Sequence, residues 1–135
     1  GETEINTLSD FYLSVGFSNI QLSTPAEHDK IIAYTSQLAH IISNAYVKSP
    51  TALLHHGFSA GSYRDLTRVA KLNEKMWTEL FFDNRDNLIE ETDRLILRLC
   101  EYSDALKKFD REGMSELLKN GSILKEKIDK GDEDE

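Results

Sequence analysis

A stretch of seventeen residues without one charged side chain limits what this chain can fold into. Residues 31–47 contain no Asp, Glu, Lys or Arg, although 30% of the chain is charged. Residues 24–27, Thr-Pro-Ala-Glu, predict a helix start with a capping threonine, a proline in the first position and a glutamate that closes a capping box. We expect this helix over about residues 25–48, ending before Pro50. A helix apolar on most sides must be buried on most sides, so other elements must pack around it.

The net charge of the chain argues against two classes of partner. The formal net charge is −8, whereas a nucleic-acid-binding domain would present a basic face, and an anionic membrane surface would repel this chain. The uncharged run is also slightly too short for a usual membrane span. It carries polar side chains as well, which favour a protein core or interface over lipid: Thr35, Ser36, Gln37, His40, Ser43 and Asn44.

The chain has 135 residues and a single cysteine, Cys100. This length suits one domain with a modest core. A lone cysteine in a helical pattern gives no internal disulfide and no cysteine metal site, which fits a reducing cytoplasm. The first residues are acidic and polar and do not form a signal peptide.

The spacing of apolar residues predicts helices along most of the chain. The region before the uncharged run differs, because residues 17–22 alternate loosely and predict one short strand after a helix that Gly16 ends. A helix followed by a single strand is half of a parallel α/β unit, so we expect a remnant of a larger α/β domain over 1–23. The alternative is an extended linker. After this segment we expect a helical domain over 24–130 and an acidic tail over 131–135, with helices near 3–15, 25–48, 62–72, 84–109 and 111–129 and a short helix after Asn73. Asn73 can cap that short helix, and Asn84 or Asp83 the helix that follows it.

A basic stripe stands out on this acidic chain. Arg64, Arg68, Lys71 and Lys75 would share one face if the helix from Ser62 continued that far. A guanidinium group suits a carboxylate because its planar fork donates two parallel hydrogen bonds. The alternative is a solvated helix face, which charge runs usually are. The backbone N–H groups that follow Gly61 could also bind an anion.

The histidine inside the uncharged helix, His40, has two interpretations. It is either a core histidine bonded to a neighbouring group such as Ser36, or a hydrogen-bonding contact for a bound polar ligand. Metal binding is disfavoured, since Ser36 and Asn44 occupy the positions one turn away. We expect His55 and His56 to face water in a loop, and Trp77 to lie in a core or interface. Spacing alone therefore predicts a helical binding or assembly domain.

Three runs, taken together in this order, resemble a known family. They are His-Asp at 28–29 leading into Thr-Ser-Gln-Leu-Ala-His at 35–40, Ser-Ala-Gly-Ser-Tyr-Arg-Asp-Leu-Thr-Arg-Val-Ala at 59–70, and Met-Trp-Thr-Glu-Leu-Phe at 76–81 with Asn-Arg-Asp-Asn-Leu at 84–88. From about residue 3 to residue 106 the chain resembles the C-terminal helical domain of prephenate dehydrogenase. It departs from that pattern at Ala39, where many members have proline, and at Gln37, where some have histidine.

The resemblance implies an all-α dimerisation domain of the phosphogluconate-dehydrogenase-like C-terminal type, preceded by a leftover helix and strand of a Rossmann domain. The family oxidatively decarboxylates prephenate to 4-hydroxyphenylpyruvate with NAD, in tyrosine biosynthesis, as a cytoplasmic homodimer. The catalytic histidine and the NAD-binding loop belong to the Rossmann domain, so this chain alone is expected to be inactive. Neither a catalytic, a cofactor-binding nor a metal-binding residue is assigned to this chain.

The motif carries five substrate-site residues onto this sequence. His40 matches a histidine that lines the substrate pocket, and Arg68 matches an arginine that holds a substrate carboxylate. Asp65 matches an acid near the pocket and the dimer seam, Trp77 an aromatic wall, and Gly61 a point of close backbone approach. Arogenate or a related hydroxy acid as the substrate, NADP as the cofactor, and a purely structural helical module all remain open alternatives.

Overall fold

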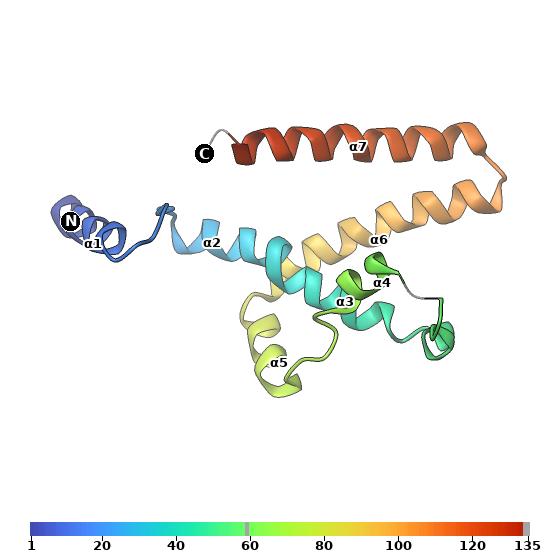
Figure 1. Ribbon diagram of the computed structural model, residues 1–135, viewed down its shortest axis with the longest axis horizontal. Helices are drawn as coiled ribbons and strands as arrows, with labels where there is room; N and C mark the ends of the chain where they lie inside the picture. The colour runs from blue at the N-terminus through green and yellow to red at the C-terminus, as the bar shows by residue number, and fades with distance from the viewer. Residues whose placement is uncertain (59, 134–135) are drawn as a thin grey trace.

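The computed structural model describes residues 1–58 and 60–133, and regular structure within them is helical throughout (Figure 1). The prediction of an all-α fold is therefore confirmed. The elements in chain order are α1 (Glu2–Ser14), α2 (Pro25–Ile32), the π-helix η1 (Ala33–Leu38), α3 (Ala39–Tyr46), the 3-10 helix η2 (Pro50–Leu54), α4 (Gly61–Thr67), α5 (Glu74–Asp83), α6 (Arg85–Lys107) and α7 (Arg111–Glu133). None of these helices combines the length and the apolar character that crossing a membrane requires.

The uncharged run lies within one continuous rod, formed by α2, η1 and α3 end to end (Figure 1). The predicted capping box is present. The Thr24 hydroxyl accepts a hydrogen bond from the Glu27 N–H at 3.3 Å, and the Glu27 carboxylate accepts one from the Thr24 N–H at 2.8 Å. The prediction differs from the structure at two places. The rod ends at Tyr46, two residues early, and residues 33–38 form a wider π turn that helical spacing alone does not predict.

The small core of the chain lies where α6 crosses this rod. Ala33 and Leu38 of η1 are buried there, and so is Leu88 of α6. Ala33 has no side chain beyond its Cβ, so the two helices can approach closely at this position. Ser43 of α3 is also buried, and its hydroxyl has no hydrogen-bond partner in the described residues. The uncharged face is thus buried as predicted, but only around one crossing.

A buried glutamine fixes the corner between α5 and α6 onto the rod. Gln37 donates to the carbonyl oxygen of Leu80 at 3.1 Å and accepts from the Asn84 amide at 2.9 Å. The same Asn84 amide donates to the carbonyl of Asp29 at 2.7 Å. Asn84 stands at the N-cap of α6, one of the two predicted positions, yet its side chain makes no capping bond, and its oxygen instead accepts from the Asn87 side-chain amide at 2.8 Å. Satisfied buried polar groups of this kind hold the elements in one arrangement.

Helices α6 and α7 form an antiparallel hairpin and diverge away from their turn (Figure 1). Phe109 has a φ of 54° in the turn, and the Asp110 carboxylate accepts from the Gly113 N–H at 2.9 Å, which starts α7. Helix α7 continues to Glu133, so the prediction that it ends near 129 is wrong, and residues 131–133 of the acidic segment are helical. Residues 134–135 of that tail lie outside the described residues.

The predicted strand is the clearest correction. Within the described residues, 17–22 form no strand, and they connect α1 to α2 in an extended, irregular path. Gly16, with a φ of 106°, ends α1 as predicted. A strand needs a neighbour to pair with, and the described residues contain no other extended segment to supply one. The alternative interpretation, an extended linker, describes this segment.

The basic stripe is a second correction. Helix α4 ends at Thr67, and Arg68 is its C-terminal cap. Lys71 then lies in an irregular connector, and Lys75 lies in the first turn of α5. The four basic residues therefore do not share one helix face. The sequence prediction extended this helix too far because no strong stop signal stands between residues 67 and 71. Asn73 does cap α5 as predicted, and its side chain accepts from the N–H groups of Lys75 and Met76.

Candidate functional site

The imidazole of His40 is held at its Nδ1 atom. Nδ1 lies 2.8 Å from the carbonyl oxygen of Ser36, one turn back in the π segment. A carbonyl oxygen only accepts, so Nδ1 carries the proton and donates. The other ring atom, Nε2, has no partner among the described residues. It can accept a hydrogen bond from a ligand when the ring is neutral and donate one when the ring is protonated. The first interpretation, a bond to Ser36, is therefore confirmed at Nδ1, and the ligand contact stays a prediction for Nε2.

Trp77 forms a wall against this imidazole. The two rings stack with centroids 3.8 Å apart and planes 29° from parallel, and Phe81 follows at 5.4 Å from Trp77. Trp77 belongs to α5, which is N-capped by Asn73 and tied to the rod through the Leu80 carbonyl. The pair is half-buried. The structure therefore brings together two of the five predicted residues, on two different helices.

The other three predicted residues lie on or beside α4. Gly61 begins this helix, and Asp65 and Arg68 are exposed. Within the described residues, no hydrogen bond or ion pair engages the side chains of Asp65 and Arg68. In the described residues, no hydrogen bond, ion pair or ring contact joins them to His40 or Trp77. Arg68 thus presents a guanidinium group whose donors are available to a carboxylate.

A side-chain bond nevertheless links the Arg68 segment to the histidine face. Asn44 donates to the carbonyl oxygen of Ala70 at 3.1 Å. Asn44 follows His40 by one helical turn and shares its face of α3. The backbone two residues after Arg68 is therefore anchored one turn from His40. Asn44 therefore positions the Arg68 segment. In the sequence it stood out only as one of the polar residues of the uncharged run.

A hollow lies at the end of the rod away from α1. It has a volume of about 610 Å³ and is lined by Tyr46, Ser49, Thr51, Ala52, Leu54, His55, Phe58, Ala60, Ser62 and Tyr63. His55 is half-buried there and stacks against Tyr63 at 4.7 Å, and its Nδ1 atom is buried without a partner in the described residues. The prediction that His55 faces water is wrong, whereas His56 is exposed. A signal was present, because residues 49–63 are also free of charge.

Titration and metal binding add little to this site. In residues 1–58 and 60–133, no three His, Cys, Asp or Glu side chains gather closely enough to hold a metal ion. A lowered pKa lies outside the site, at Glu27, where the hydrogen bond from the Thr24 backbone stabilises the carboxylate. The arrangement instead offers an aromatic wall, one free imidazole nitrogen and one free guanidinium group, which suits a planar or cyclic ligand that carries a carboxylate.

Known proteins resemble this chain over the helical region that carries the candidate site. Residues 24–120 match the family model described as the dimerization domain of prephenate dehydrogenase. A cyclohexadienyl dehydrogenase of Zymomonas mobilis is 29% identical over 120 residues, which cover 83% of this chain and 40% of that protein. The chain therefore spans about two fifths of the length of this curated relative.

Two solved structures share the fold. The arogenate dehydrogenase of Synechocystis superposes with a TM-score of 0.78 at 21% identity, over 95% of this chain and 48% of that one. The prephenate dehydrogenase of A. aeolicus, solved with hydroxyphenyl propionate and NAD+, superposes with a TM-score of 0.75 at 22% identity, over 95% of this chain and 46% of that one. At this identity the likeness concerns the fold alone.

Proposed function

The chain belongs to the prephenate dehydrogenase family through its dimerization domain, and we propose that it supplies the substrate-clamping and dimer-forming part of an NAD-dependent enzyme. That enzyme oxidatively decarboxylates prephenate to 4-hydroxyphenylpyruvate, in tyrosine biosynthesis. The observation that carries this proposal is the His40–Trp77 stack, whose free Nε2 atom lies one turn from the anchor of the Arg68 segment.

The chemistry of prephenate fits these groups. Prephenate is a dianion with a six-membered ring, so it needs a cationic fork for a carboxylate and a flat wall for the ring. Arg68 would donate two parallel hydrogen bonds to one carboxylate. His40 would contact a polar group through Nε2, while its fixed Nδ1 keeps the ring orientation constant. Gly61 and Asp65 would border the same ligand from α4, and Trp77 would wall it. Together these contacts orient the substrate for hydride transfer.

The large exposed area of the chain supports contacts with two macromolecular partners. A compact chain of 15.4 kDa is expected to expose about 7,200 Å², whereas this one exposes 11461 Å². The excess of roughly 4,000 Å² is larger than the share of one subunit in most obligate dimers, about 1,000–2,500 Å². We therefore include both a second copy of the chain and a Rossmann domain, packed near α1, among the proposed neighbours. Exposed apolar side chains on α1, including Leu8, Phe11 and Val15, support the second contact.

The cofactor belongs to that Rossmann domain in this proposal. The seven glycines of the chain contain no Gly-x-Gly-x-x-Gly spacing, so no NAD contact is assigned to its residues. When bound, NAD would accept the hydride from the substrate. The residues of this chain would only bind and orient the substrate and exclude water. We place the reaction in the cytoplasm, where a lone exposed thiol such as Cys100 stays reduced.

The decisive experiment joins the chain to the Rossmann domain of a relative and measures prephenate-dependent NADH formation. Arg68→Ala in this protein is expected to raise KM for prephenate at least tenfold, equivalent to about 1.4 kcal/mol of lost binding. Arg64→Ala, an exposed arginine on the same helix, serves as the control and should leave KM within about twofold. Equal kinetics for the Arg68 variant and its parent would remove Arg68 from the site.

Arogenate is the second candidate substrate, because similar proteins are named cyclohexadienyl and arogenate dehydrogenase. Arogenate has an amino group where prephenate has a keto group, so the two differ at one end only. The ratio of kcat/KM for the two substrates decides between them. A purely structural module is the third possibility. No heat in calorimetry with either 4-hydroxyphenylpyruvate or tyrosine, using the joined protein, would favour it.

A further inference from the structure

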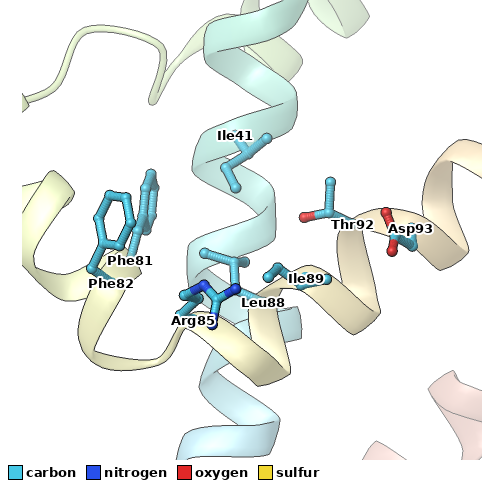
Figure 2. A pocket seen from close by; sticks show the side chains of 8 residues that line it. All are labelled: Ile41, Phe81, Phe82, Arg85, Leu88, Ile89, Thr92 and Asp93. Atoms are coloured by element: carbon cyan, nitrogen blue, oxygen red, sulfur yellow. The ribbon is translucent and has the colours of Figure 1, made fainter.

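Helix α5 carries the Trp77 wall, but apolar packing alone does not hold this helix against the rod. Within residues 74–83, all of which the structure describes, no residue is buried. A second hollow, of about 350 Å³, opens between α5 and the rod. Figure 2 shows Phe81 and Phe82 on its α5 side and Ile41 on its rod side. The place of Trp77 against the rod therefore depends on contacts of another kind.

Two such contacts join the rod to α5, and they are three residues apart on each helix. The Gln37 amide donates to the Leu80 carbonyl at 3.1 Å, and the His40 ring stacks on Trp77 with centroids 3.8 Å apart. Residues three apart share a helix face and are separated by about 4.5 Å along its axis. Within residues 1–58 and 60–133, no other hydrogen bond joins α5 to the rod. The bond from Gln37 thus fixes the backbone of α5 about one turn from the two stacked rings.

Neighbouring amides fix which end of the Gln37 side chain faces α5. The Asn84 NH₂ group donates to Gln37 Oε1 at 2.9 Å and to the Asp29 carbonyl at 2.7 Å. The Asn84 oxygen in turn accepts from the Asn87 amide at 2.8 Å, so turning the Asn84 amide over would lose all three bonds. The oxygen of Gln37 is thereby occupied, and its NH₂ group faces the Leu80 carbonyl, which can only accept.

We propose that Gln37 is a positioning residue for the substrate site, and that its bond to Leu80 sets the place of the Trp77 wall against the His40 ring. Gln37 is 5% exposed, so it is closed off from a ligand and acts through Trp77. This inference rests on the proposed function, and it adds a residue that shapes the site without contacting the substrate. A buried amide bonded at both ends is costly to disturb, which keeps the wall in one place.

Proton NMR of the chain tests the position of the wall directly. Protons that lie over the face of an indole ring resonate upfield, so the ring protons of His40 should be shifted relative to those of the exposed His28. Gln37→Leu removes the bond to Leu80 and should abolish at least about half of this shift, because α5 can then move away from the rod. A His40→Ala variant identifies the resonances.

Asn44→Leu is the matched control for this measurement. It removes a bond of the same kind from the same rod, but one to the carbonyl of Ala70 and not to α5. It should therefore leave the His40 shift unchanged. If Gln37→Leu does not fold, Gln37→Met carries the test, because its side chain is unbranched and similar in length to that of glutamine. An unchanged His40 shift in a folded Gln37 variant overturns the proposal.

Kinetics of the chain joined to a Rossmann domain give the second test. The wall would contact the substrate both before and during the reaction, so Gln37→Leu should raise KM for prephenate at least threefold and leave kcat within about twofold. A merely less stable protein would lose active enzyme, which lowers the apparent kcat and leaves KM unchanged. A lost His40 shift with an unchanged KM would contradict the proposed function, because the stack would then lie outside the substrate site. An unchanged shift overturns the role of Gln37 whatever the joined protein catalyses.

Discussion

Helix α6 has one apolar face at its crossing with the rod and another, here called the outer stripe, formed by Ile89, Ile96 and Leu99; the two differ in how far their side chains are buried. At the crossing, Ala33, Leu38 and Leu88 are buried and Gln37 makes hydrogen bonds through both its amide atoms. On the outer stripe, Ile96 and Leu99 are more than half exposed. One helix thus carries one face completed by its own chain and one that is not. The difference indicates that the chain folds around a small core of its own, and that its exposed apolar face needs another protein surface to cover it.

Truncating one leucine on each face should separate the two regions most strongly. Leu88→Ala is expected to lower the free energy of unfolding by about 2–5 kcal/mol, because it leaves a cavity in the core. Leu99→Ala removes the same atoms from an exposed site and should cost less than about 1 kcal/mol within one chain. Urea denaturation at several protein concentrations measures both. A larger cost for Leu99 that shrinks as the chain is diluted would report burial against another copy.

The next largest effect is expected at the buried amide. Gln37→Leu keeps much of the volume but removes one of the two hydrogen bonds to the Leu80 carbonyl and leaves one donor of Asn84 without a partner, at a cost of about 1–3 kcal/mol. Thr35→Ala, an exposed hydroxyl that bonds the Ile31 carbonyl in the same rod, is a suitable control. Equal stability of the Gln37 variant and its parent would mean that the corner of α5 and α6 is held by packing alone.

The imidazole should report the geometry of the site through the single tryptophan. Trp77 is the one tryptophan of the chain, and the His40 ring covers one of its faces. His40→Ala exposes that face to water and should move the fluorescence emission to longer wavelength, with little loss of stability. His56→Ala, whose ring is exposed on another segment, should leave the emission unchanged. An unchanged spectrum in the His40 variant would contradict the stack.

The smallest expected effect is a pH dependence at the start of the rod. Hydrogen bonds from Thr24 lower the pKa of Glu27 below its ordinary value of 4.5. A carboxyl whose folded pKa is depressed adds stability above its unfolded pKa, and this contribution is lost as the pH falls through the folded value. As the pH falls from the unfolded pKa of Glu27 through its lower folded pKa, the melting temperature should therefore drop more for the parent protein than for the Glu27→Gln variant. A parallel pH profile in both proteins would remove the capping box as the cause.

Local signals in the sequence predicted those parts of the fold that depend on neighbouring residues. The capping box at Thr24, the Asn73 cap and the stop at Gly16 were each visible, because each acts within a few residues. The strand at 17–22 and the continuous basic stripe were wrong, because each assumed that a local pattern continued without knowing its tertiary neighbours. The π segment was missed for the same reason, since ordinary helical residues compose it.

The candidate site was likewise predicted only in part. The resemblance supplied His40 and Trp77, and the structure brings their rings together. No hydrogen bond, ion pair or ring contact among the described residues joins Asp65 or Arg68 to these rings, so the assignments of Gly61, Asp65 and Arg68 remain proposals. The roles of Asn44 and Gln37 follow from bonds to backbone carbonyls 26 and 43 residues away. No pattern along the sequence specifies such distant partners.

Sedimentation equilibrium on the 135-residue chain tests the central claim most directly, namely that the apolar surface it leaves exposed is covered by a second copy. The account predicts a mass twice the 15.4 kDa of the chain at micromolar concentration. A mass of one chain in the parent protein across the whole concentration range would contradict it.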